Sequence, residues 1–374
     1  MQEFHYERLE AAFALIADGV RAGAYPGAVA AVGRGQGMTI TRAFGDAVIE
    51  PVHYPMRAET LFDLASMTKV LATTPALLRL IEDDILALDT RVRFIVPEFA
   101  DSGTTIEHLL THTSGLAAWR PLYLDYKGLD EYRDAICDRE SRHADAGEEV
   151  NYSDLGFILL RVIIERVTGE PFAEHCRRTV LDPLGMTRTD WLPRAPQAQI
   201  AATERGNEVE RGMCEGRAGE FSGWRMGMIW GQCNDGNAWY GLDGVSSHAG
   251  LFGPVGDVEK YARMWLAQGG AFLRDDTVEL AGRCFTEGMP EHRGLGWAKP
   301  PPAVHLQTNP SCGRKMTNSA IGHTGFTGTS LWIDPFMDVF VILLTNRLHP
   351  SARQGIAAIR AAFHDAVIDA LGGS

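Results

Sequence analysis

The chain has 374 residues, of which 45% are hydrophobic and 22% are charged, and this ordinary globular composition excludes a wholly disordered protein. Its formal net charge of −13 argues against nucleic acid or an anionic membrane as a partner, because both require a basic surface. The length predicts either two domains or one large domain with an insertion.

The N-terminal segment is apolar enough to be compared with a signal peptide. Glutamates precede the apolar residues 11–17, whereas a signal peptide has positive charge there. Apolar residues instead recur at helical spacing, at Phe4, Leu9, Phe13, Ile16 and Val20. The six cysteines form no CxxC pair, which favours a reducing compartment over a zinc site or a disulfide framework. We therefore predict an N-terminal helix and a cytoplasmic protein.

Strands are predicted at both ends of the chain. Residues 27–34 and 38–44 form one pair around a glycine-rich turn, and residues 329–333 and 339–344 form another. The last of these is the longest aliphatic run near the C-terminus and is far too short to span a membrane. A final helix is predicted over about residues 352–371.

The middle of the chain has a different pattern. Residues up to about 188 show helical periodicity, and the following stretch is irregular. A single sheet built from both chain ends, with a helical insertion between them, accounts for this order. We predict a discontinuous α/β sheet domain of residues 1–68 and 246–374, and a mainly helical domain of residues 69–245 that covers the cleft.

Ser66-x-x-Lys69 stands where an apolar segment gives way to a helix. Residues three apart share a helix face, so the two side chains would adjoin. Free N–H groups at a helix N-terminus suit an oxyanion, but a lysine is a poor base at neutral pH unless burial or positive charge lowers its pKa. The motif alone is weak, since a capped helix with a surface lysine gives the same pattern.

Two further motifs accompany it. Tyr152-x-Asp154 precedes an apolar helix in the middle of the chain, and His323-Thr324-Gly325 lies on a strand near the C-terminus. Glycine weakens a strand, and its presence indicates either close approach of a ligand or a bulge or tight bend.

In this order the three motifs resemble those of the serine β-lactamase and penicillin-binding-protein superfamily. The tyrosine of the second motif is most similar to the branch of class C β-lactamases, D-alanyl-D-alanine carboxypeptidases and family VIII esterases. Segments 109–116 and 248–252 resemble structural signatures of that branch. The resemblance implies an α+β, β-lactamase/transpeptidase-like fold, in which helices flank an antiparallel sheet and a mainly helical domain is inserted.

The resemblance also implies roles for individual residues. Ser66 would attack an ester or amide carbonyl, and Lys69 and Tyr152 would take and return its proton as a coupled pair. The backbone N–H groups of Ser66 and Phe326 would form the oxyanion hole. The substrate would be bound by Asp154, His323, Thr324 and Gly325. No metal or organic cofactor is implied.

Two residues depart from the usual pattern. His323 stands where lysine is more common, and a neutral imidazole would attract an anionic substrate less strongly. Asp154 stands where asparagine is usual, and a carboxylate near Lys69 would favour the ammonium and oppose its action as a base. Either Asp154 points away, or Tyr152 carries more of the proton transfer.

The leading functional hypothesis is a carboxylesterase for small to medium acyl esters. One alternative is a D-alanyl-D-alanine carboxypeptidase, a D-amino-acid amidase or peptidase, or a weak β-lactamase. Another is a catalytically silent relative that binds an acyl ligand or a partner protein, which only Asp154 favours. A small-molecule ester or amide is the expected partner, and the sequence gives no indication of oligomeric state.

Some aromatic and histidine residues have two interpretations. Trp224, Trp230, Trp239 and Tyr240 cluster in the irregular stretch, where they either wall an acyl pocket or pack a long loop. His248 is expected to be structural.

Overall fold

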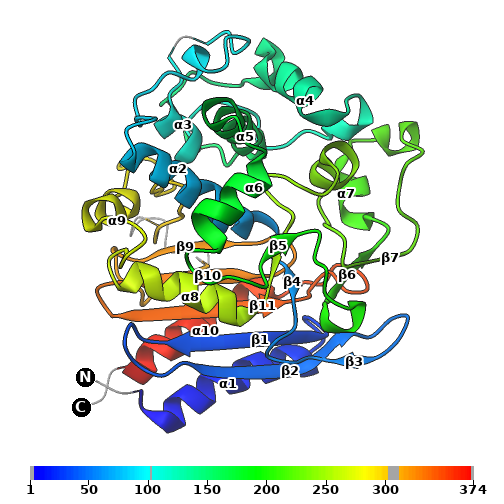
Figure 1. Cartoon of the computed structure of the whole chain (residues 1–374). Helices are drawn as coiled ribbons and strands as arrows, with labels where there is room; N and C mark the ends of the chain where they lie inside the picture. Colours follow the sequence, from blue (N-terminus) through cyan, green and yellow to red (C-terminus); the bar gives the residue numbers. More distant parts are fainter. Residues whose placement is uncertain (1–3, 102, 302–310, 372–374) are drawn as a thin grey trace.

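The computed structural model describes residues 4–101, 103–301 and 311–371. A six-stranded antiparallel sheet lies at its centre, in the order β3-β2-β1-β11-β10-β9 (Figure 1). Its strands are β1 (Gly27–Gly33), β2 (Ile40–Val48), β3 (Tyr54–Pro55), β9 (Ile321–Thr324), β10 (Ser330–Asp334) and β11 (Val339–Thr345). The predicted sheet from both chain ends is therefore confirmed, because β1 pairs directly with β11.

The two faces of the sheet bury two separate cores. Along β1, alternate side chains point to opposite faces, so that Ala30 and Val32 join one core and Val29 and Ala31 join the other. Helices α1 (Tyr6–Arg21) and α10 (Ile356–Leu371) cover the first face, where Phe13 packs on Phe363. Helix α8 (Val255–Leu266) covers the second. This double burial explains the uninterrupted apolar sequence of β1 and β11.

The central part of the chain is helical, as predicted. Its helices are α2 (Thr74–Glu82), α3 (Ile106–Leu110), α4 (Gly128–Cys137), α5 (Asp154–Thr168), α6 (Phe172–Cys176) and α7 (Glu208–Met213); α9 (Asp275–Gly282) follows α8. In Figure 1, α2 to α7 gather on the β9 side of the sheet, far from α1. Helix α5 begins where the Ser153 hydroxyl accepts a hydrogen bond from Gly156 N–H, and it ends at Gly169, which has a positive φ of 69°.

Two small sheets complete the fold. Strands β4 (Phe62–Asp63), β8 (Leu251–Gly253) and β5 (Asp190–Trp191) form one, in the order β4-β8-β5. Strands β6 (Ala202–Arg205) and β7 (Met228–Trp230) form the other, within the stretch that the sequence marked as irregular. The β4–β8 pairing matters for the site, because it places the residues before Ser66 beside those after His248.

The glycine at position 322 is explained by packing between strands. Ligand approach or a bend was expected for the glycines on the strand of the third motif, but Gly322 pairs regularly with Trp332 of β10. A Cβ at position 322 would overlap the indole ring of Trp332, which is itself buried.

We expect Gly322→Ala to lower the free energy of unfolding by about 1–3 kcal/mol, because the methyl group overpacks the core. Chemical denaturation measures the change. Gly256→Ala in α8 is the matched control, since an added Cβ there meets nothing within 4 Å and the helix gains a better helix former. An unchanged unfolding midpoint for Gly322→Ala would contradict this explanation.

Candidate active site

Ser66 follows a strained turn. Ala65 has a φ of 47°, a left-handed conformation that alanine rarely adopts and that persists only where the surroundings enforce it. The buried Asp63 carboxylate accepts hydrogen bonds from Ala65 N–H at 2.9 Å and from Asn234 N–H at 2.7 Å. The Thr68 hydroxyl donates to the Ala65 carbonyl at 2.6 Å. These contacts fix the orientation of Ser66.

Lys69 is completely buried and fully hydrogen-bonded. Its Nζ donates to Ser66 Oγ at 3.2 Å, to Asp154 Oδ1 at 2.6 Å and to the His248 carbonyl at 3.0 Å, which uses all three ammonium donors. Burial opposes the charged form, but the Asp154 carboxylate and Tyr152 outweigh it, so the pKa of Lys69 is raised. Asp154 therefore does not point away, and the resting lysine is an ammonium.

The Tyr152 phenol lies between two cations. Its ring centroid is 4.9 Å from Lys69 Nζ and 5.4 Å from Arg293 Cζ, and the ring packs on His112 at 4.5 Å between centroids. Burial raises the pKa of Tyr152, and the Lys69 ammonium opposes this. Among the described residues, no partner meets its buried hydroxyl with hydrogen-bond geometry, although Lys69 and Ser66 lie close enough to lower its pKa, so the oxygen is available to a reacting group.

The third motif lies on β9 and just after it. His323 is buried, and its ring centroid is 5.8 Å from that of Tyr152. Burial, with Lys69 and Arg293 nearby, lowers the pKa of His323 to about 3, so the imidazole is neutral at pH 7. Its Nδ1 lies 2.8 Å from the Thr324 carbonyl and must carry the proton, since only an N–H can donate to that oxygen.

A cavity of about 620 Å³ joins these groups. The predicted residues Ser66, Tyr152, Thr324, Gly325 and Phe326 all contribute to its lining. Among the described residues, no acceptor takes the N–H of either Ser66 or Phe326, so both remain free to donate to an oxyanion. Asp154 lies behind the cavity, where it contacts Lys69, and does not line it.

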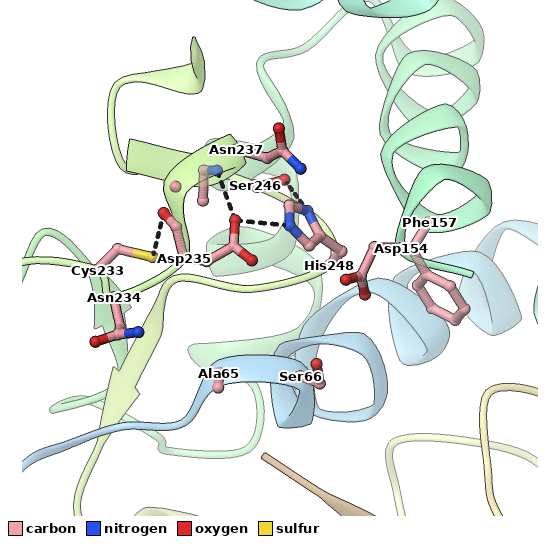
Figure 2. Close-up of polar contacts among 12 residues, drawn as sticks. Ala65, Ser66, Asp154, Phe157, Cys233, Asn234, Asp235, Asn237, Ser246 and His248 are labelled. Carbon is pink, nitrogen blue, oxygen red and sulfur yellow. Dashed lines mark hydrogen bonds and ion pairs between the residues drawn. The ribbon is translucent and has the colours of Figure 1, made fainter. Parts of the chain in front are cut away.

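Behind Lys69 is a second polar network. Asp235 and Asp154 flank His248 in Figure 2; Asp235 Oδ1 is 3.0 Å from His248 Nε2, and Ser246 Oγ is 2.7 Å from Nδ1. The ligand atoms of Asp154, Asp235 and His248 lie within 4.8 Å of one another, a spacing that would suit a metal ion. The Lys69 ammonium already supplies a positive charge to Asp154, so a divalent cation would be repelled there.

Sequence reasoning missed several residues of the site. Arg293 and Asp235 reach it from loops distant in the chain, and no local pattern marks them. His112 lies in segment 109–116, which resembled a family signature, but its place beneath Tyr152 was not foreseen.

The four aromatic residues of the irregular stretch pack within the protein and do not wall an acyl pocket. Trp224 and Tyr240 pack edge to face at 5.7 Å between ring centroids, and none of the four aromatic residues of that cluster is among the described residues that line the cavity. His248 is buried as expected, but its carbonyl oxygen also accepts a hydrogen bond from Lys69 Nζ.

Comparisons with known proteins identify the family and the fold. The sequence model of the family described as Beta-lactamase matches residues 12–365. A relative from Escherichia coli (strain K12), named "Putative D-alanyl-D-alanine carboxypeptidase", is 33% identical over 325 residues, which cover 79% of this chain and 71% of the relative.

Two solved structures share the fold. "EstCE1, a hydrolase with promiscuous acyltransferase activity" is 22% identical, has a TM-score of 0.76 and covers 97% of this chain and 99% of its own. The "octameric penicillin-binding protein homologue from Pyrococcus abyssi" is 20% identical, with a TM-score of 0.70 over 96% of this chain and 76% of its own.

The fold and the motifs define a serine hydrolase with a β-lactamase/transpeptidase-like architecture. More particularly, the chain belongs to the beta-lactamase family. Among the described helices, none is both long and apolar enough to cross a lipid bilayer.

We expect Asp154→Asn to move the acidic limb of the pH–rate profile of Ser66 labelling to lower pH by about one unit or more. The Asp154 carboxylate raises the pKa of Tyr152 and of Lys69, so its removal lets these two proton-transfer residues lose their protons at lower pH. A fluorophosphonate probe followed by mass spectrometry measures the labelling rate at each pH. Asp134→Asn, which removes a carboxylate that is 62% exposed, serves as the control. Identical profiles for both variants would contradict the assignment.

We expect the ring resonances of His323 to stay constant between about pH 5 and pH 8, because the buried imidazole remains neutral throughout this range. NMR titration measures this, and the spectrum of His323→Gln assigns the signals. A titration midpoint near the reference value of about 6.5 would show that the ring is solvated or paired with an anion.

Proposed function

We propose that this chain is a carboxylesterase that hydrolyses small to medium acyl esters through an acyl-enzyme on Ser66. The observation that carries the proposal is the position of Ser66 Oγ, 3.2 Å from Lys69 Nζ and beside the unpartnered Tyr152 hydroxyl, in one cavity. A nucleophile next to two proton-transfer groups is the arrangement that acyl transfer requires.

Tyr152 is the better candidate for the base, because Lys69 is held as an ammonium by Asp154. The phenolate of Tyr152 would take the Ser66 proton as Oγ bonds to the carbonyl carbon, with Lys69 and Arg293 stabilising the phenolate charge. The N–H groups of Ser66 and Phe326 would hold the oxyanion, and one such donor is worth about 2.7–4 kcal/mol. Tyr152 would then protonate the leaving oxygen, and water would repeat the sequence to release the acid.

The electrostatics favour an ester over an amide. A raised pKa makes the Tyr152 phenolate scarce at neutral pH, so the site suits the more electrophilic carbonyl and better leaving group of an ester. The similarity of the fold to EstCE1, a hydrolase with promiscuous acyltransferase activity, is consistent with acyl transfer at this site.

A D-alanyl-D-alanine carboxypeptidase is the second candidate, and Arg293 favours it. This guanidinium is paired with Glu291 at 2.5 Å, but it lies beside Tyr152 and lowers the pKa of His323, so it brings positive charge to a site where His323 is neutral. Such a charge would attract the carboxylate of a peptide terminus. The similarity to the Escherichia coli relative, which is named a D-alanyl-D-alanine carboxypeptidase, supports the same candidate.

We expect Ser66→Ala to abolish turnover of p-nitrophenyl butyrate, and Tyr152→Phe to reduce kcat by about 10²- to 10⁴-fold through loss of the proton carrier. Intact-protein mass spectrometry after brief mixing detects the acyl-enzyme. Ser351→Ala, which removes an exposed serine, is the control.

Benzylpenicillin, tested in parallel, separates the two candidates. Ester turnover without a lasting penicilloyl adduct supports the esterase, whereas a stable adduct on Ser66 favours the carboxypeptidase. A folded protein that gives neither turnover nor adduct would contradict both and leave the silent binder.

A further inference from the structure

The two N–H groups proposed for the oxyanion hole lie on segments that are distant in the chain. Ser66 follows β4, whereas Phe326 stands in the connection between β9 and β10, residues 325–329, which we call the oxyanion loop. An oxyanion hole stabilises charge only while both donors point at one oxygen. The oxyanion loop must therefore be held at a fixed distance from the segment that carries Ser66.

Main-chain hydrogen bonds close the oxyanion loop on itself. Gly325 N–H donates to the Thr329 carbonyl at 2.8 Å, and Gly328 N–H donates to the Gly325 carbonyl at 3.0 Å. Both bonds lie within the loop and give it its shape. Its position relative to the nucleophile depends on other contacts.

Two buried hydroxyl groups of the loop make the connection. Thr327 Oγ1 donates to the main-chain carbonyl of Asp63 at 2.6 Å, and Thr329 Oγ1 donates to that of Leu64 at 3.1 Å. Thr327 is 2% exposed and Thr329 is fully buried, so both bonds are shielded from water. Because Thr327 directly follows Phe326, the shorter bond is made by the neighbour of one oxyanion donor.

Close packing of the two main chains accompanies these bonds. A Cβ added at Gly325 would lie 2.5 Å from the Leu64 carbonyl oxygen and 3.3 Å from Ala65 Cβ. The missing side chain at position 325 therefore lets the loop approach the turn before Ser66 directly.

Asp63 links the oxyanion loop to the nucleophile. Its carbonyl accepts the hydrogen bond from Thr327, and its carboxylate accepts one from Ala65 N–H at 2.9 Å. Ala65 is the strained residue directly before Ser66. One residue therefore holds the neighbour of each oxyanion donor, through its main chain on one side and its side chain on the other.

We propose that Thr327 is a positioning residue for the oxyanion hole. Its bond to Asp63 sets the separation between the N–H groups of Ser66 and Phe326. This inference rests on the proposed function, because the oxyanion develops on the acyl group that Ser66 attacks. Since that charge exists only after the attack, loss of the Thr327 hydroxyl slows the reaction more than it weakens substrate binding.

Kinetics with p-nitrophenyl butyrate test the proposal. Thr327→Val keeps the shape of the side chain and removes the hydroxyl. We expect it to lower kcat by about 10- to 100-fold and to change KM less than about threefold, because misplacement of a reacting group by about 1 Å costs such a factor. Thr327→Ser restores the hydroxyl and should return kcat to within about threefold of the wild-type value. If Thr327→Val does not fold, Thr327→Ala replaces it, since alanine leaves no methyl group facing the Asp63 carbonyl.

Thr203→Val is the matched control. Thr203 is 4% exposed and its hydroxyl donates to the Ile229 carbonyl at 3.2 Å, so the variant loses the same kind of buried bond. Neither residue is among the described residues that line the cavity. We expect this variant to lower the unfolding midpoint comparably and to leave kcat unchanged. A kcat loss for Thr327→Val no larger than that of the control, or failure of serine to restore kcat, would overturn the proposal.

Crystal structures provide a readout that does not depend on turnover. We expect the distance between the backbone nitrogens of Ser66 and Phe326 to differ by about 0.5 Å or more between the wild type and Thr327→Val, and to be unchanged in Thr203→Val. If the wild type hydrolyses no ester but this displacement is present, the proposed function fails while the positioning role stands. An unchanged distance in Thr327→Val overturns the positioning role even where ester turnover is found.

Discussion

The buried ion pair between Lys69 and Asp154 is the interaction on which the site depends. Its 2.6 Å contact joins the turn after β4 to the first residue of α5, and the same ammonium holds the His248 carbonyl before β8. An uncompensated ammonium in this position would be expensive, and breaking such a pair costs about 3–5 kcal/mol. The ion pair thereby ties the start of α5 to the segment that carries Ser66. In the proposed mechanism, the same contact keeps Lys69 protonated and leaves Tyr152 as the base.

Asp63 plays a comparable part on the other side of Ser66. Its two carboxylate oxygens hold the strained Ala65 and the backbone of Asn234. The residue after Asn234 is Asp235, which contacts His248, whose carbonyl in turn accepts from Lys69. The nucleophile is therefore surrounded by buried polar groups that support one another, and such networks stabilise a single geometry when every member is satisfied. Among the described residues that line the cavity, Tyr152, His323, Arg293 and Arg360 each have a buried polar atom without a hydrogen bond.

Much of this arrangement was predictable from the sequence, for local reasons. β1 and β11 are apolar at nearly every position, whereas a strand with one face in solvent would alternate apolar and polar residues, so burial of both faces could be predicted. Three short motifs in a fixed order indicated the family. The strand glycine at 322 was misread because packing against Trp332 leaves no local trace. The orientation of Asp154 could not be decided, since it depends on where α5 begins relative to Lys69. Arg293, Arg347 and Arg360 reach the cavity through contacts between distant segments, which neither periodicity nor spacing records.

The pairing of β1 with β11 has a consequence for how the chain acquires its structure. The inner strand of the N-terminal hairpin has its hydrogen-bonding edge filled by a strand that is synthesised after the entire helical part. Until β11 emerges from the ribosome, β1 presents an apolar, unpaired edge of the kind that promotes intermolecular strand association. A topology dominated by such distant pairing also folds slowly. Translation interrupted before residue 339 would therefore leave a product that aggregates instead of forming a smaller stable enzyme.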